Sequence, residues 1–210
     1  MPKERRVILL TGFGPFPGVA ENATARLVPE LALRAAEAFP EHTFHHDILE
    51  TAWGAAPQRA ADLIATHRPI LALHFGVSRD ADGFRIERTA QNVCRIAADV
   101  TGYLPAAAQL DCTGPDARTA RLDTAALAAH LGARGYPVSV SDDAGAYLCN
   151  AVLYHSLAAA EGLAPWACRA GFVHIPADLT GPPLSFPEAL EGSLEIIRAE
   201  LQTIDASFDS

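Results

Sequence analysis

The sequence lacks the long apolar segments that membrane proteins and secreted proteins carry. No stretch of it reaches the length of a transmembrane helix. The first six residues are followed by only a short apolar run, Val7–Leu10, which is too short for the core of a secretory signal. We therefore expect a cytoplasmic protein without a membrane partner.

Positive charge is also scarce. The chain has 16 lysine and arginine residues against 25 aspartate and glutamate residues, which gives a formal net charge of −9 at pH 7. A chain with so little basic surface is not expected to bind nucleic acid or an anionic membrane. A neutral or small-molecule substrate suits this composition better.

Patterns that bind metals or nucleotides are missing as well. No C-x-x-C pair occurs, and the histidines show no ligand spacing. The loop at residues 11–18 has neither the G-x-G-x-x-G order nor a G-K-[ST] ending, and its prolines remove N–H groups that a phosphate would need. We expect no metal and no cofactor. In a reducing compartment each cysteine is then either a small buried side chain that fills the core or a reactive thiol. The four cysteines are Cys94, Cys112, Cys149 and Cys168.

What the chain does have is enough apolar sequence for one core, since 50% of its 210 residues are hydrophobic. We expect a single α/β domain over residues 1–210. Apolar, β-branched runs alternate with helical stretches, which predicts an open twisted, mostly parallel sheet with helices on both faces. Strands are expected near Val7–Thr11, Phe44–Leu49, Pro69–Phe75, Pro137–Ser141 and Gly171–Ile175. Helices are expected near Asn22–Phe39, Ala55–Thr66, Leu122–Ala133, Tyr147–Ala160 and Pro187–Leu201.

Two places interrupt this regular alternation. Pro29 lies within the first expected helix, where it either kinks the helix or marks its true start. Between Arg79 and Pro115 the alternation of strand and helix breaks down. Within that region, apolar and charged residues alternate over Phe84–Arg88, which predicts a half-exposed strand in an extended excursion.

Cys149 is a candidate nucleophile because of where its segment places it. Small, turn-forming residues lead from a strand into an amphipathic helix, so the thiol should lie in the first helical turn. Unpaired N–H groups and the positive end of the helix dipole favour a thiolate there and can bind an oxyanion. Asp142 and Asp143 would oppose this if they point inward. The alternative is that Cys149, beside Leu148 and Val152, is an ordinary buried side chain.

Two further residues could complete a catalytic set with this cysteine. His174 ends a short apolar strand, and sheets of this kind place their sites at the carboxyl ends of parallel strands. It is either a base or a core histidine whose ring nitrogens are hydrogen-bonded within the fold. His74, which is also expected to end a strand, is the competing base. Glu87 is either a solvated acid or a buried carboxylate that orients an imidazole. A cysteine nucleophile needs a base, and the base needs an acceptor, so these residue types together suit nucleophilic catalysis.

Two phenylalanines, Phe13 and Phe16, stand on the glycine- and proline-rich loop after the first expected strand. A rigid loop could hold them in the wall of an apolar pocket. They could equally fill the core.

Four separated motifs in this chain resemble the pyroglutamyl peptidase I family, also called pyrrolidone-carboxylate peptidases, which are cysteine peptidases with an α/β fold. The order glutamate, cysteine, histidine is also that of the family. The match extends from the first expected strand to about Pro176. The matching segments are Thr11–Phe16 against T-G-F-x-P-F, Glu87–Asn92 against E-R-x-A-x-N, Ala144–Asn150 against A-G-T-[FY]-[VL]-C-N, and Gly171–Pro176 against G-F-[IV]-H-[IV]-P.

The resemblance implies a role for each of the three candidate catalytic residues. Cys149 would attack the carbonyl of an N-terminal pyroglutamyl residue, His174 would carry the proton, and Glu87 would orient the imidazole. The chain departs from the family pattern at Ala146, where threonine is common, and at Asn22–Thr24, which replaces Asn-Pro-Ser.

The same resemblance implies residues around the substrate. Phe13 and Phe16 would sandwich the lactam ring, with Tyr147 and Leu148 in the same pocket, and Arg95 would help to stabilise the oxyanion. It also implies a homotetramer, although the loop after residue 176 is short for the family.

Two other functions are compatible with the same residues. The chain could be a hydrolase or amidase that uses this triad on a different cyclic or blocked substrate. It could also be a catalytically silent binding protein that keeps the fold, in which case Cys149 would be an unreactive buried thiol. A substrate panel separates the first alternative, and the rate of thiol alkylation separates the second.

Overall fold

The structure is a computed structural model that describes residues 6–16, 18–163 and 168–208. Its centre is a six-stranded sheet in the order β2-β1-β3-β8-β4-β7. Neighbouring strands are parallel except for β4, which runs antiparallel to β8. The strands are β1 (Arg6–Phe13), β2 (His42–Leu49), β3 (Leu71–Ser78), β4 (Phe84–Glu87), β7 (Val138–Ser141) and β8 (Arg169–Pro176).

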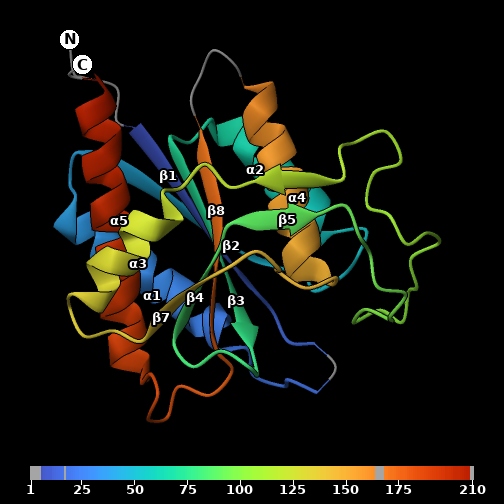
Figure 1. The fold of residues 1–210 in the computed structure, drawn as a ribbon, viewed down its shortest axis with the longest axis horizontal. Coiled ribbons are helices and arrows are strands. Elements are labelled where there is room, and N and C mark those ends of the chain that lie inside the picture. The colour runs from blue at the N-terminus through green and yellow to red at the C-terminus, as the bar shows by residue number, and fades with distance from the viewer. Residues whose placement is uncertain (1–5, 17, 164–167, 209–210) are drawn as a thin grey trace.

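Helices cover both faces of this sheet, which confirms the predicted fold class (Figure 1). One face is covered by α1 (Ala23–Ala38), α3 (Thr124–Gly132) and α5 (Phe186–Phe208). The other face is covered by α2 (Ala56–His67) and α4 (Leu148–Gly162). Among the described residues, no helix combines the length and the apolar character needed to cross a membrane.

Strand β1 shows why the apolar runs predicted the sheet correctly. Ile8 and Leu10 point into the core under α1 and α5, whereas Leu9 and Phe13 point into the core under α2 and α4. All four side chains are buried. Because both faces of the strand are covered, the apolar residues form a continuous run instead of an alternating one. Each buried aliphatic side chain contributes about 1.5–3 kcal/mol to the free energy of folding.

Helix α1 begins before Pro29, so Pro29 does not mark its start. Asn22 is the N-cap, and its side-chain oxygen accepts a hydrogen bond from the Thr24 backbone N–H at 3.1 Å. This cap satisfies one of the N–H groups that every helix leaves unpaired at its start. The same Asn22 side chain donates to the carbonyl of Gly14 at 3.1 Å, which fixes the loop that follows β1.

The prediction of a half-exposed strand near residues 84–88 was wrong in its burial. Strand β4 lies inside the sheet between β8 and β7, and Phe84, Ile86 and Glu87 are all buried. Its charged residues suggested an exposed side, but on that side Arg85 is half-buried and Glu87 is buried against His174 of β8. The chain then forms β5 (Thr89–Gln91), which pairs with β6 (Ala117–Thr119) in a two-stranded sheet against α4 (Figure 1).

Several element boundaries also differ from the expectation. Strand β3, for example, begins at Leu71, two residues after the expected start at Pro69. Helix α5 continues to Phe208 instead of ending near Leu201. It continues because Ile204, one turn further on, is still buried in the core.

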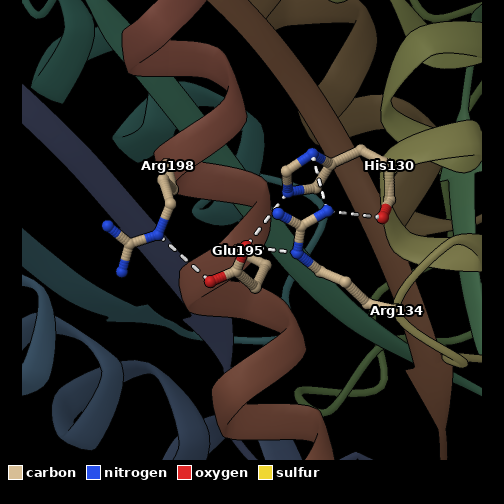
Figure 2. A network of polar contacts seen from close by, with 4 residues as sticks. All are labelled: His130, Arg134, Glu195 and Arg198. Atoms are coloured by element: carbon tan, nitrogen blue, oxygen red, sulfur yellow. Dashed lines mark hydrogen bonds and ion pairs between the residues drawn. The ribbon is translucent and has the colours of Figure 1, made fainter.

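A polar network on the side of the sheet away from α4 joins α3 to α5 (Figure 2). The Glu195 carboxylate lies 3.0 Å from Nε2 of His130, 2.9 Å from Nε of Arg134 and 3.1 Å from Nε of Arg198. Partly exposed ion pairs of this kind contribute about 0–1 kcal/mol each. The packing of these helices therefore depends mainly on their apolar side chains.

Candidate active site

Cys149 is the second residue of α4, so its thiol lies in the first helical turn, as the sequence predicted. The chain enters the helix through Gly145, whose φ of +80° is a left-handed conformation that glycine adopts without strain. Tyr147, the N-cap residue, is extended and makes no side-chain hydrogen bond to the helix. The N–H groups of the first turn therefore stay available to an anion.

The two aspartates before this helix do not both oppose a thiolate. Asp142 forms an ion pair with Arg88 at the exposed surface. Asp143 accepts a hydrogen bond from the Gly145 N–H at 2.9 Å, which stabilises the turn. Only Asp143 lines the cavity that contains Cys149.

Glu87 and His174 meet across the antiparallel pair of strands β4 and β8. Glu87 Oε1 lies 2.8 Å from His174 Nδ1, and Glu87 is completely buried. A carboxylate only accepts hydrogen bonds, so this contact keeps a proton on Nδ1. Nε2 is then the nitrogen left to act on Cys149, which lines the same cavity and whose negative charge helps to raise the pKa of His174.

The charge state of His174 follows from these contacts. Burial acts to lower the pKa of the imidazole, but the negative charge and hydrogen bond of Cys149, together with Glu87, outweigh it. They raise the pKa of His174 from 6.5 to about 9. At neutral pH the charged form of the His174 imidazole is therefore favoured, and a cation beside a thiol is what activates a cysteine nucleophile.

His74, the competing base, lies elsewhere. Its Nδ1 is 2.7 Å from Oγ1 of Thr11, and its ring is completely buried. Burial lowers the pKa of His74 to about 4, so it is neutral at physiological pH. Its place in β3 beside β1 pairs it with Thr11, and Cys149 is not among the partners of its ring nitrogens.

Gly76 provides the space in which the thiol lies. A Cβ atom at this position would come within 3.1 Å of Cys149 Sγ and 2.7 Å of the Phe172 ring. Gly76 is also the register partner of His174 in the neighbouring strand. The absence of a side chain there lets the nucleophile approach the sheet beside the imidazole.

A cavity of about 420 Å³ opens beside Cys149 and His174. The predicted substrate-binding residues all line it: Phe13, Phe16, Tyr147 and Leu148. Phe13 is also part of the core, since it is buried and its ring centroid lies 6.2 Å from that of Phe172. Phe16 is only half-buried. Phe13 is therefore both part of the cavity wall and part of the core.

Arg95 also lines this cavity. Its guanidinium lies 5.6 Å from the centroid of the Tyr147 ring. Its backbone N–H donates to the carbonyl of Ala146 at 2.7 Å, which joins the loop between β5 and β6 to the turn before Cys149.

Comparisons with known proteins identify the family of this chain. The profile of a family described as "Pyroglutamyl peptidase" matches residues 6–180. This chain belongs to the pyroglutamyl peptidase family. A pyrrolidone-carboxylate peptidase of Vibrio vulnificus is 32% identical over 173 residues, which cover 81% of this chain and 78% of that relative. One of Cupriavidus pinatubonensis is 34% identical over 178 residues, with the same shares of each chain.

Solved structures of the pyroglutamyl peptidase family share the fold. Pyrrolidone carboxyl peptidase from the hyperthermophile Pyrococcus furiosus superposes with a TM-score of 0.83 at 25% identity, over 94% of this chain and 99% of that chain. Pyroglutamyl peptidase I of Bacillus amyloliquefaciens gives a TM-score of 0.79 over 91% and 95% of the two chains. At 22% identity, that second likeness supports the fold alone.

One residue that organises the candidate site was not predicted from the sequence. Asn150 is completely buried next to Cys149. Its side chain accepts from the Gln91 N–H at 2.8 Å and donates to the carbonyls of Gln91 at 2.8 Å and Val93 at 3.1 Å. It therefore joins the segment after Glu87 to the helix that bears the nucleophile. The only local signal was an asparagine directly after the cysteine.

The other cysteines of this pyroglutamyl peptidase family member lie in different environments. Cys94 and Cys168 are buried, and burial raises the pKa of both thiols, that of Cys168 to about 12. Cys112 is exposed, and all four cysteines are free. Among the described residues, no group of three histidine, cysteine, aspartate or glutamate side chains is placed to hold a metal ion.

Proposed function

We propose that this chain is a cysteine peptidase that removes the N-terminal pyroglutamyl residue from peptides, with Cys149 as nucleophile, His174 as base and Glu87 as orienting residue. The observation that carries the proposal is the placement of His174 with the other two residues: Nδ1 lies 2.8 Å from Glu87, and Cys149 lines the same cavity, where its charge helps to raise the pKa of His174. Membership of the pyroglutamyl peptidase family supports the choice of substrate.

In the proposed reaction the Cys149 thiolate attacks the carbonyl carbon of the pyroglutamyl residue. The His174 imidazolium then gives its proton to the leaving amine, and a thioester remains on Cys149. His174 next takes a proton from water, which attacks the thioester and releases pyroglutamate. Glu87 holds the imidazole in the same orientation during both steps.

The negative charge on the carbonyl oxygen needs donors during both steps. We propose the backbone N–H groups of the first turn of α4, with help from Arg95, because Tyr147 leaves those groups uncapped and Arg95 lines the same cavity. Removing one oxyanion donor costs about 3 kcal/mol in comparable sites.

The cavity suits a pyroglutamyl group because that group is a flat lactam without a free amine or carboxylate on its ring. We propose that Phe13 and Phe16 enclose the ring and that Tyr147 and Leu148 complete its apolar surroundings. An N-terminal glutamine or glutamate would bring an ammonium group into the same space. Burying that charge without a partner is costly, so such peptides should be rejected.

The pKa of His174 predicts the alkaline limit of activity. Its folded-state pKa of about 9 lies above the ordinary value of 6.5, so the imidazolium is favoured below about pH 9 and lost as the pH rises through that value. Because the leaving amine needs this proton, kcat should fall above about pH 9. A pH profile of kcat measures this. A decline that begins near pH 6.5 would show that the imidazolium is not stabilised by Cys149 and Glu87.

The proposed function is tested with the purified protein and a pyroglutamyl fluorogenic amide, beside the glutaminyl and prolyl analogues. The expected result is cleavage of the pyroglutamyl amide alone. Equal or faster cleavage of an analogue would mean that the site acts on another substrate. If none is cleaved and Cys149 reacts no faster with iodoacetamide than Cys168 does, the peptidase proposal fails.

We also propose that the chain works as a homo-oligomer in the reducing cytoplasm. Four free cysteines fit a reducing compartment. Large apolar side chains that are 43–54% exposed lie close together in sequence in the loop between β5 and β6, as expected of a surface that another copy covers. Light scattering after size exclusion should give a mass above that of one chain, and a monomer at micromolar concentration would contradict this. The exposed side chains are Val93, Ile96, Val100, Tyr103 and Leu104.

A further inference from the structure

The loop at residues 92–116, between β5 and β6, contains no helix or strand, yet part of it is bonded to segments of the active site. Its backbone receives or gives hydrogen bonds at Ala97, Ala98 and Val100, and each bond leads to the segment after β2 or to the residue before α4. Both of those segments contribute residues to the wall of the cavity.

Asp99 is the centre of this attachment. It is 3% exposed, and its carboxylate accepts four hydrogen bonds. Oδ1 accepts from the Thr101 N–H at 2.8 Å, the Thr101 hydroxyl at 2.7 Å and the Tyr103 N–H at 3.0 Å, which closes a local turn. Oδ2 instead accepts from the Trp53 N–H at 2.8 Å, in a different part of the chain.

The contact continues from Trp53 to the cavity. The Trp53 ring packs edge-on against the Tyr147 ring, with centroids 5.0 Å apart and an interplanar angle of 84°. Its indole N–H donates to the Ala97 carbonyl at 2.9 Å, and the Tyr147 hydroxyl donates to the neighbouring Ala98 carbonyl at 3.0 Å. Trp53 and Tyr147 are therefore held both by their contact with each other and by their hydrogen bonds to the carbonyls of residues 97 and 98. Tyr147 lines the cavity next to Cys149.

A second bond places Thr51 in the same arrangement. The Val100 N–H donates to the Thr51 carbonyl at 3.2 Å. The Thr51 hydroxyl donates to the Gly14 carbonyl at 3.1 Å, in the loop that carries Phe13 and Phe16. Thr51 also lines the cavity, so the segment around Asp99 supports two sides of it without lining it itself.

The same loop contains a second aspartate, Asp111, that makes a similar turn without a bond to Trp53. Asp111 makes the same local turn, because its Oδ1 accepts from the Thr113 N–H at 2.8 Å and the Thr113 hydroxyl at 2.7 Å. Within the described part of the chain, its carboxylate makes no hydrogen bond to a segment that lines the cavity. The two aspartates therefore separate the effect of a local turn from the effect of the bond to Trp53.

We propose that Asp99 is a positioning residue that holds Trp53, and through it Tyr147, in the wall that binds the acyl group of the substrate, while its turn places Val100 against Thr51 in the same wall. This inference rests on the proposed function, since it assigns Asp99 to substrate binding in that reaction. Asp99 is not among the residues that line the cavity with Cys149 and His174. Its loss should therefore weaken substrate binding and leave the chemistry of the thiol unchanged.

The test compares Asp99→Asn with Asp111→Asn in the full chain. An amide at position 99 can present its NH₂ group to the Trp53 N–H, which replaces an acceptor by a second donor. Loss of a hydrogen bond to a charged group should raise KM for the pyroglutamyl amide about tenfold or more. The kcat value and the rate at which iodoacetamide alkylates Cys149 should remain those of the wild type. Asp111→Asn should change none of the three.

A second variant keeps the inference testable if Asp99→Asn does not fold. Trp53→Phe keeps the backbone N–H that Asp99 accepts but loses the indole bond to Ala97, so KM should rise by a smaller factor with kcat unchanged. An unchanged KM in both variants would overturn the proposal. So would an equal change in Asp111→Asn, or a loss of alkylation rate that parallels the loss of activity. An inert wild type with normal Cys149 alkylation would instead refute the proposed function.

Discussion

Replacing Cys149 by alanine is expected to lower kcat for the pyroglutamyl amide by about 10⁶-fold, close to the limit of detection. Without the thiol no thioester can form, and only the oxyanion donors and the pocket remain to assist water. Hydrolysis of the amide, measured beside the wild type at equal concentration, checks this. Substrate binding should persist, because the cavity walls do not depend on the sulfur.

Cys112→Ala is the matched control for this variant. Cys112 is exposed and does not line the cavity, so its replacement should leave kcat and KM unchanged. If Cys149→Ala kept more than a trace of activity while Cys112→Ala lost it, the nucleophile would have been assigned wrongly.

Replacing Glu87 by glutamine is expected to lower kcat by about 10³–10⁴-fold with a much smaller effect on KM. The amide can present NH₂ to His174 Nδ1, where the carboxylate accepts a proton, so the imidazole loses its fixed tautomer. The charge that helps to raise the pKa of His174 is also lost. The alkaline limit of the pH profile should therefore move below pH 9 in this variant. Steady-state kinetics across pH measure both effects.

The control for this variant is another buried glutamate, Glu200. It is 1% exposed and forms an ion pair with Arg169 at 2.7 Å, and it does not line the cavity. Glu200→Gln should keep kcat even if it lowers the melting temperature, because breaking a buried ion pair is destabilising. Equal losses of kcat in both variants, in step with lost stability, would mean that Glu87 acts only in folding.

The layers of the fold and the place of Cys149 could be predicted from the sequence because both depend on local pattern. Continuous apolar runs such as the one in β1 indicate strands covered on both faces. The small residues before Tyr147 indicate a turn into a helix, which places the thiol in the first turn. These features involve residues that are close together in the chain.

The choice between His74 and His174 could not be made from local sequence, since each stands in an apolar strand shortly before a glycine or a proline. What separates them is the strand beside each one. His74 is the register partner of Thr11 in β1, whereas His174 lies in β8 next to β4, which brings Glu87. Only the resemblance to a family, which covers distant segments together, selected His174.

The burial of Glu87 escaped local prediction for the same reason. Strand β4 is short and charged, and its burial depends on pairing with β7 and β8, which lie far along the chain. Likewise, the role of Asp99 depends on Trp53, which belongs to a different loop. Residues whose partners are distant in sequence carry no local signal of their function.

The most direct test of the account is to trap the acyl-enzyme. The wild-type protein is mixed with a pyroglutamyl aryl ester, quenched in acid within its first turnovers, digested and analysed by mass spectrometry. A pyroglutamyl adduct is expected on the peptide that contains Cys149, and on no other cysteine peptide; the corresponding prolyl ester should give none. Rapid release of pyroglutamate with no adduct on Cys149, or with the adduct on Cys112, would contradict it.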